Sequence, residues 1–207
     1  AGGPSPSATT SAQPTDEQPA PQPSETAPEG GIGDKLSKLL ASVKPPSSYE
    51  MTIIPPAGTD AGPITSIMKM SGGKPVKAKM LHEDGWAITD LEAKVMYMHD
   101  KGMGENVAFR MPLQTDQQED VTAQSDFVDQ EAAITGSDSV DGVKCWVYST
   151  TAGGATHKVW VGKKDGLPRQ TESEEGIAKF QYSRINEIKD SEFDLPEGIE
   201  VTDMSQM

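Results

Sequence analysis

Apolar and polar residues alternate along most of the chain from residue 49 onwards, which is the pattern of half-buried β-strands. In the N-terminal half this alternation predicts strands over Tyr49 to Ile53, Ile64 to Met70, Val76 to Leu81, Trp86 to Asp90 and Lys94 to His99. Glycine-rich and acidic turns separate the segments, which follow one another at a spacing of about ten residues. Short strands at such regular spacing predict an antiparallel meander.

The last third of the chain shows the same alternation and a clear hairpin. Cys145 stands between two valines on one face of a predicted strand, and Trp146 falls on the other face. A later strand carries Trp160 and is followed by Asp165-Gly166, which can supply the positive φ angles of a tight turn. We therefore expect the Trp160 strand to pair antiparallel with a strand that begins near Leu167.

Two segments depart from the strand pattern. Four apolar residues recur at helical spacing over Lys35 to Val43, with Asp34 as a candidate N-cap and Pro45-Pro46 as the end of a short helix. Residues 115 to 132 hold six acids, no base and a thin apolar stripe, which predicts a second helix or a mobile lid. The order of helix, strands, helical insertion and strands predicts an α+β fold: a strongly curved antiparallel sheet with helices on its concave side.

The C-terminal motifs also have a characteristic order. Gly136 to Tyr148 holds a glycine and a Trp-containing strand, Asp165-Gly-Leu-Pro168 forms a turn, and Phe193-Asp-Leu-Pro-Glu-Gly198 follows a further strand. This order resembles the C-terminal half of LolA-like proteins, the superfamily of lipoprotein carriers and sorting proteins. The resemblance covers roughly residues 34 to 204, and it implies an incomplete β-barrel around an apolar cavity. Lys77 and Lys79 stand where the carriers use an arginine, which favours a tethered member over a diffusing shuttle.

Residues 1 to 31 differ in composition from the rest of the chain. They hold seven of the sixteen prolines, four acids, no aromatic residue and no Lys or Arg. Such a segment cannot bury enough apolar surface to offset its conformational entropy, so we expect a disordered Pro/Ser/Thr-rich tether and one LolA-like domain over 32 to 207. Ala1-Gly-Gly-Pro-Ser5 is typical of the stretch behind the lipidated cysteine of a bacterial lipoprotein; an ordinary secreted tail is the alternative.

Charge and motifs exclude several classes of function. The chain carries a formal charge of −14, of which −10 falls on residues 32 to 207, and this repels the phosphate backbone of nucleic acids. The sequence contains no run of about 18 apolar residues, so it predicts no membrane-spanning helix. The three histidines stand singly, Cys145 is expected to be a buried and inert thiol, and no catalytic motif is present. We therefore expect no enzymatic activity, no cofactor and no metal.

Methionine is the unusual residue of this chain. Ten are present, and the pairs Met68/Met70 and Met96/Met98 each project from one face of a strand. Three interpretations stay open: an ordinary core, a soft wall for an apolar ligand such as an acyl chain, and a Cu(I) site of thioethers with a nearby histidine. The LolA-like resemblance favours the second. The candidate lining residues are Met51, Met68, Met70, Met80, Met96, Met98, Trp86, Trp146, Trp160 and Phe180.

These observations lead to three functional hypotheses. The first is an extracytoplasmic module, in the periplasm or at the cell surface, that holds a lipid or other hydrophobic small molecule and meets the membrane only through an N-terminal lipid anchor. The second is a module of the same fold that binds another envelope protein, as a signalling sensor would. The third is copper binding through methionines.

Overall fold

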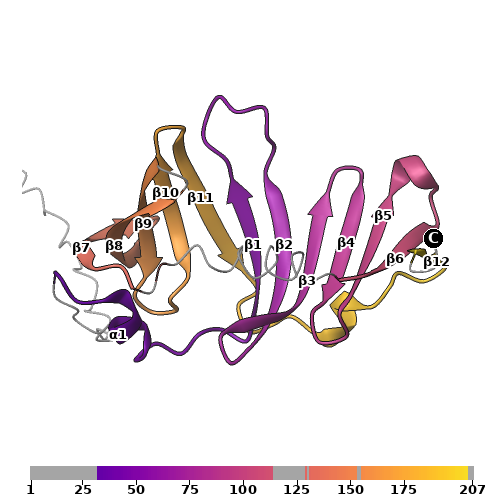
Figure 1. Cartoon of the computed structure of the whole chain (residues 1–207), viewed down its shortest axis with the longest axis horizontal. Coiled ribbons are helices and arrows are strands. Elements are labelled where there is room, and N and C mark those ends of the chain that lie inside the picture. Colours follow the sequence, from indigo (N-terminus) through magenta and orange to yellow (C-terminus); the bar gives the residue numbers. More distant parts are fainter. Residues whose placement is uncertain (1–31, 114–128, 130, 153–154, 205–207) are drawn as a thin grey trace, which may run out of the picture.

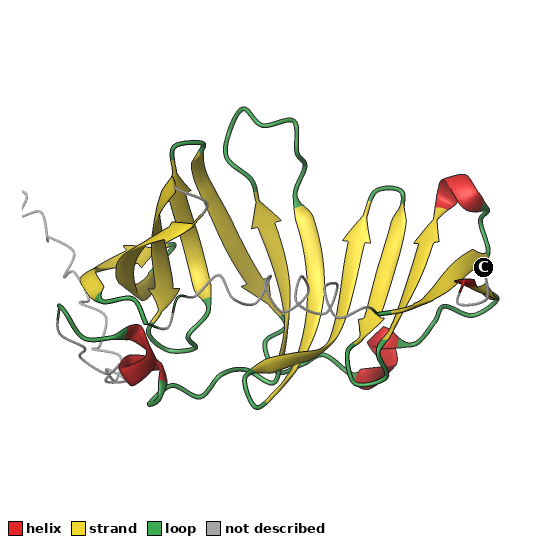
Figure 2. Ribbon diagram, in the orientation of Figure 1, coloured by secondary structure: helices red, strands yellow, loops and turns green. Residues whose placement is uncertain are grey.

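The computed structural model describes residues 32–113, 129, 131–152 and 155–204. Twelve strands in this part form one open sheet in the order β12-β6-β5-β4-β3-β2-β1-β11-β10-β9-β8-β7 (Figures 1 and 2). The strands are β1 Ser48–Ile54, β2 Ile64–Ser71, β3 Lys74–His82, β4 Gly85–Asp90, β5 Val95–Asp100, β6 Val107–Pro112, β7 Ile134–Val140, β8 Val143–Ala152, β9 Ala155–Gly162, β10 Pro168–Ser173, β11 Gly176–Ser183 and β12 Glu200–Asp203. Neighbouring strands run antiparallel except β12 and β6, which run parallel. Figure 1 shows that the sheet curves between its two separate edges, β12 and β7.

The strands and the hairpin predicted from alternation are confirmed. The five predicted N-terminal strands correspond to β1 through β5, with small differences at their ends. In the C-terminal half, β9 pairs antiparallel with β10 as expected. Gly166 lies in the turn between them with a φ of +71°, and its N–H donates to the carbonyl oxygen of Gly162 over 2.9 Å. The local turn residues therefore predicted this hairpin correctly.

The predicted α+β class is wrong, because the described part of the chain is almost entirely sheet. Its helical elements are the five-residue helix α1 (Leu36–Leu40) and the 3-10 turns η1 (Lys101–Met103) and η2 (Asp190–Phe193). The second predicted helix, over residues 115 to 132, falls almost wholly outside the described residues. None of the helices described is long and apolar enough to cross a membrane.

The predicted helix over Lys35 to Val43 is shorter than expected, and Asp34 does not cap it. Lys35 is the N-cap residue, with extended backbone angles and no capping hydrogen bond from its side chain. The reason is competition from strand-like pairing: the N–H of Ile134 donates to Asp34 O over 2.9 Å, and Lys35 forms a bridge with Ala133. These contacts hold the chain extended up to the first helical residue, Leu36.

The register of the strands divides their side chains between two faces. We call the face that carries Met51 the methionine face, and the other the opposite face. On the methionine face, α1 packs over β7, β8 and β9 in a core cluster of Leu36, Leu39, Ile134, Trp146, Tyr148, Val159 and Val161. On the opposite face the same strands bury a second cluster of Val140, Cys145, Val147 and Trp160. Cys145 is thus buried as predicted, and burial raises the pKa of its thiol.

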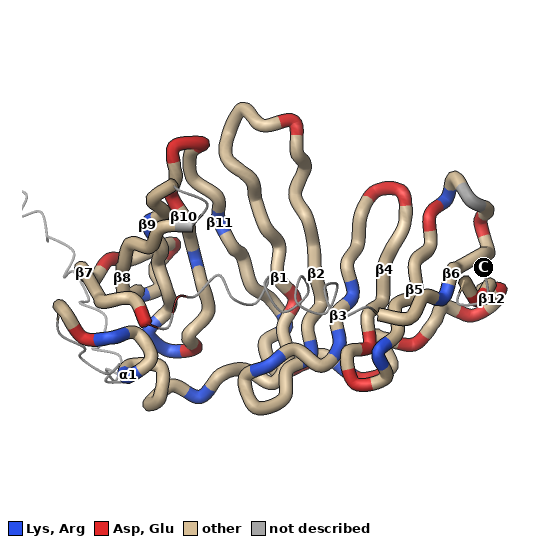
Figure 3. The backbone as a smooth tube through the Cα atoms, viewed as in Figure 1, with Lys and Arg blue, Asp and Glu red and all other residues tan. Residues whose placement is uncertain are grey.

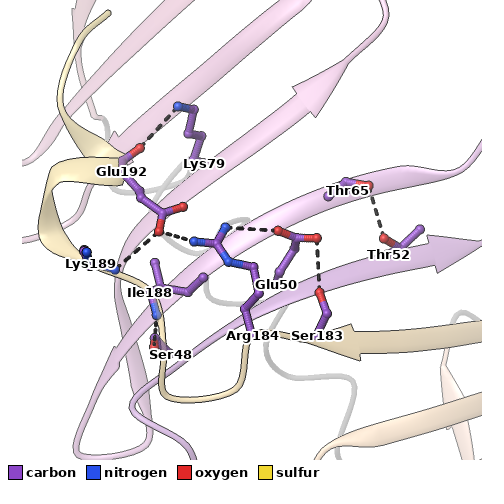
Figure 4. Close-up of polar contacts among 10 residues, drawn as sticks. All are labelled: Ser48, Glu50, Thr52, Thr65, Lys79, Ser183, Arg184, Ile188, Lys189 and Glu192. Carbon is purple, nitrogen blue, oxygen red and sulfur yellow. Dashed lines mark hydrogen bonds and ion pairs between the residues drawn. The ribbon is translucent and has the colours of Figure 1, made fainter.

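The segment after β11 crosses the opposite face and is held there by charged and apolar contacts (Figure 4). The Arg184 guanidinium pairs with Glu50 over 3.3 Å and also with Glu192, and Lys79 Nζ donates to the backbone oxygen of Glu192 over 3.2 Å. Phe193 is buried against Ile67 and Ile88 of the sheet. This C-terminal segment therefore covers the opposite face over β2, β3 and β4.

Candidate functional site

Seven methionine side chains project from the methionine face across the first six strands. The pairing of β1 with β2 sets Met51 opposite Ser66 and Tyr49 opposite Met68, and each following pair of strands carries the same face onward. The residues that share this face are Met51, Met68, Met70, Met80, Met96, Met98 and Met111. Thioethers from β1, β2, β3, β5 and β6 therefore form one continuous surface.

Small residues lie between most of these methionines along two rows that run across the strands, whereas Met96 and Met111 are direct neighbours. The first row runs Met51, Ser66, Met80, Ala87, Met98, Phe109. The second row runs Tyr49, Met68, Ala78, Thr89, Met96, Met111. Directly paired residues on one face have Cβ atoms about 5 Å apart, so each small residue leaves space that a flexible thioether can enter or leave.

Burial divides the methionine face into a packed end and a more open end. Met51 and Met68 are only 5% and 3% exposed, and they pack with Tyr49, Leu167 and Phe180. Met80, Met96, Met98 and Met111, nearer the β12 edge, are half-buried. Met70 at the end of β2 is half-buried as well, so solvent or a ligand can reach these five thioethers but not those of Met51 and Met68.

Eight of the ten residues predicted to line the site lie on the methionine face. Six are the predicted methionines, and the other two are Phe180 and Trp146. Trp146 is fully buried beneath α1 and belongs to the core cluster there, away from the accessible thioethers. The alternation pattern, from which the methionine pairs were predicted, thus identified most of the residues that share this face.

Two predicted residues, Trp86 and Trp160, lie on the opposite face. Trp86 stacks on His99 with ring centroids 5.4 Å apart and packs near Phe193. Trp160 donates from Nε1 to Asp138 over 3.1 Å, and Lys158 Nζ lies 4.6 Å from its ring centroid. Both tryptophans are therefore part of the packing of the opposite face and lie outside the methionine surface.

Sequence reasoning missed the polar end of the methionine face. Arg169, only 8% exposed, pairs with the Asp165 carboxylate, and its guanidinium carbon lies 4.6 Å from the ring centroid of Tyr182. Tyr182 is paired with Met51 and meets Tyr49 edge-on, with ring centroids 5.4 Å apart. Nothing in the sequence singled out Arg169, because its contacts depend on the pairing of separate strands and on the β-bulge between Pro168 and Gln170.

The two tyrosines of this polar end stay protonated. Burial raises the pKa of Tyr49 to about 12, and it raises the pKa of Tyr182 well above its ordinary value. Both hydroxyls are consequently hydrogen-bond donors at any physiological pH. The polar end thus combines a buried cation with two neutral phenol groups.

The described residues contain no group of three or more His, Cys, Asp or Glu that could hold a metal ion. His99, the histidine closest in sequence to Met98, points to the opposite face, where its Nδ1 lies 2.8 Å from the backbone oxygen of Val107. A copper site would therefore have to use the thioethers without His99.

Comparison with known proteins gives distant structural likenesses. The sequence matches no protein-family profile and no curated protein. The chain is similar to LprF from Mycobacterium bovis, with 11% identity, a TM-score of 0.44 and coverage of 82% of this chain and 100% of that chain. It is also similar to the LolA superfamily protein NE2245 from Nitrosomonas europaea, with 9% identity, a TM-score of 0.35 and coverage of 78% and 98%.

A third similarity is to PNGF-II, with 14% identity, a TM-score of 0.42 and coverage of 76% of this chain. The chain spans only 31% of the length of that structure. One of these three structures belongs to the superfamily that the sequence resembles. Likenesses at such TM-scores establish no shared ligand or activity, so a functional inference has to start from the methionine face.

Proposed function

We propose that this protein is a binding module that holds an apolar ligand, such as an acyl chain, on the methionine face. The observation that carries the proposal is the set of half-buried thioethers of Met80, Met96, Met98 and Met111 on one continuous surface. Thioether side chains are apolar, polarisable and flexible, so a surface of them fits chains of different shape. The module acts by binding and not by catalysis.

The proposal places the protein outside the cytoplasm, tethered by residues 1 to 31 to an N-terminal lipid. Its support is the Pro/Ser/Thr-rich composition of those residues, which lie outside the described part of the chain. Fractionation of cells that produce the full-length protein tests this: recovery with the membrane fraction is expected, and recovery among cytoplasmic proteins would contradict it.

Identification of a co-purified ligand is the first experiment. The protein is purified without detergent, and native mass spectrometry is combined with organic extraction of the same sample. A bound lipid is expected as a mass increment that extraction removes. An increment with the mass of a peptide would instead favour the alternative function, binding of another envelope protein through the same face.

Met80 and Leu81 offer a matched pair of variants, because they are neighbours on β3 with side chains on opposite faces. Met80→Asp places a charge on the proposed binding surface and should abolish lipid retention, since a carboxylate in an apolar contact is strongly disfavoured. Leu81→Asp places the same charge on the opposite face, where Leu81 is 38% exposed, and should leave retention unchanged.

Circular dichroism establishes that both variants are folded before their lipid content is compared. Folded Met80→Asp protein that retains as much lipid as the wild type would rule out the methionine face as the binding surface. Should Met80→Asp fail to fold, Met96→Gln offers a milder test, because an amide costs less than a charge at a half-buried position.

A further inference from the structure

A buried cation lies where the methionine face meets the end of β10. The Arg169 side chain donates from Nη2 to the Asp165 carboxylate, and Asp165 Oδ1 also accepts the N–H of Leu167 over 3.1 Å. Gly162 makes room for this pair, because a Cβ there would lie 2.6 Å from Asp165 Oδ1 and 3.5 Å from Arg169 Nη2. The ion pair is therefore built into the turn between β9 and β10, next to the packed end of the methionine face.

One donor of this ion pair has no partner. Nη1 of Arg169 is buried and makes no hydrogen bond within the described part of the chain. The guanidinium lies over the ring of Tyr182, whose strand partner on the methionine face is Met51. A buried donor without an acceptor costs free energy, so a group that brings an oxygen to Nη1 would bind favourably there.

The charges around Arg169 favour an uncharged acceptor. The Asp165 carboxylate already balances the guanidinium, and Tyr49 and Tyr182 are neutral donors. A ligand carboxylate or phosphate would add an unbalanced negative charge beside Asp165 in a buried setting, which is costly. The whole chain, at −14, and the acidic tips of the β1–β2, β3–β4 and β10–β11 hairpins (Figure 3) also repel anionic amphiphiles.

We propose that Arg169, with Tyr49 and Tyr182, forms a polar subsite that binds the carbonyl oxygen of an uncharged acyl ester or amide. This subsite rests on the proposed function, because the acyl chain of the same ligand lies along the methionine face. To bring its carbonyl group to Arg169, the ligand displaces the flexible side chains of Met51 and Met68, which fill the packed end in the absence of ligand. Arg169 Nη1 donates to the carbonyl oxygen, and the tyrosine hydroxyls supply further donors. The protein accordingly selects neutral acylated molecules over free fatty acids.

Two probes with the same chain and different heads test this selectivity. 1-Decanoylglycerol and sodium decanoate are titrated separately into delipidated full-length protein at pH 8, below their critical micelle concentrations, with calorimetry as the measure of affinity. Methyl NMR of ¹³C-labelled methionines reports in parallel whether the chain reaches the methionine face. The wild type is expected to bind the glycerol ester about tenfold or more tightly than decanoate, as one satisfied buried hydrogen bond predicts.

Two variants change the subsite in opposite ways. Arg169→Lys keeps the charge that pairs with Asp165 but removes the second arm of the guanidinium, so the preference for the ester should fall about tenfold. Asp165→Asn removes the balancing charge, so the preference should move towards decanoate. Arg110→Lys is the control. It makes the same exchange in the ion pair between Arg110 of β6 and Asp203 of β12, whose charged atoms lie 2.8 Å apart, and it should leave the affinities for the ester and for decanoate unchanged.

The outcomes separate the two proposals. If neither probe binds the wild type and no methionine methyl signal shifts, the proposed function fails together with the subsite. If both probes bind and shift the methyl signals but neither folded variant changes the preference, the subsite is overturned and the methionine face stands. If the wild type binds decanoate more tightly than the glycerol ester, the inference that the subsite prefers an uncharged acceptor is overturned.

Discussion

Single residues at the turn between β9 and β10 link the hairpin to α1. Gly166 has a φ of +71°, which favours glycine, and a Cβ at this position would lie 2.9 Å from Leu40 Cδ2 of the helix. The helix thus contacts the turn of the hairpin as well as strand β9. A side chain there is strained by the backbone and also presses on the helix.

We predict that Gly166→Ala lowers the free energy of unfolding by about 1–3 kcal/mol, because it combines positive φ with the contact to Leu40. Gly198→Ala is the matched control: its φ is +83°, and nothing lies within 4 Å of the added Cβ. Urea unfolding measures both variants. Equal losses would show that Leu40 moves aside without cost and that backbone strain alone acts.

Buried tyrosines make stability sensitive to alkaline pH. The pKa of Tyr49 is raised from 10.0 to about 12 by burial. Between these two values the unfolded chain loses the phenol proton while the folded protein keeps it, so the unfolded state binds fewer protons. Stability that is fully present below pH 10 is therefore lost as pH rises from 10 to 12.

Comparison of the wild type with Tyr49→Phe isolates this contribution. We predict that the unfolding free energy of the wild type falls more steeply than that of the variant, by up to about 1.4 kcal/mol per pH unit between pH 10 and 12. Urea unfolding at a series of pH values measures the slopes. Parallel slopes would mean that Tyr49 ionises equally in the folded and unfolded chain.

At the scale of elements, the sequence predicted what depends on neighbours along the chain. The strands β1 to β5 and the β9–β10 hairpin follow from alternation and turn residues. The length of α1 did not, because Asp34 and Lys35 pair with residues 133 and 134, about a hundred positions away. The local pattern that predicts a helix contains no information about pairing with a segment so distant in the chain.

The C-terminal segment on the opposite face is an element held mainly by one aromatic side chain. Phe193 is 7% exposed and packs on Ile67 and Ile88, whereas the side chains of the surrounding ion pairs are partly exposed to solvent. Ion pairs that solvent can reach contribute little, so the segment should depend on Phe193 more than on its charges.

We predict that Phe193→Ala loosens residues 188 to 195 and leaves the sheet folded, at a cost of about 3–5 kcal/mol in local stability. Hydrogen–deuterium exchange should speed up in this segment and stay unchanged in β3 and β4. Ile185→Ala, at a position 36% exposed, is the control and should change neither. Uniformly faster exchange across the sheet would contradict a local role.

At the scale of the whole molecule, the sequence placed most of the methionines together but not the tryptophans. Within one strand, alternation shows which residues share a face, as it does for Met68 and Met70. It does not show how the faces of separate strands align, because one step of register moves a whole strand's side chains to the other side. Trp86 and Trp160 could therefore be placed only once pairing such as Leu81 with Trp86 was known.

The order of the strands was equally beyond the sequence. β1 pairs with β11, which joins the N-terminal meander to the C-terminal one, and β12 returns to lie beside β6. These contacts link positions far apart in the chain, and no local pattern encodes them. The polar end around Arg169 depends on the same long-range pairing, since Tyr182 meets Met51 only through the β1–β11 contact.

The parallel pairing of β12 with β6 has a consequence for self-association. The four residues of β12 are solvent-exposed and pair with β6. They occupy backbone donors and acceptors of β6 that neighbouring copies could otherwise use. The ion pair between Arg110 and Asp203 helps to hold β12 in place. An uncovered strand edge is a template for another chain. Deletion of residues 199 to 207 should therefore increase dimerisation or aggregation relative to the wild type as the concentration rises, and light scattering measures this. A truncated protein that associates no more than the wild type would show that β6 is protected by other means. Strand β12 would then act as an internal competitor for the edge of β6, so that a four-residue segment of the chain determines how soluble the protein is.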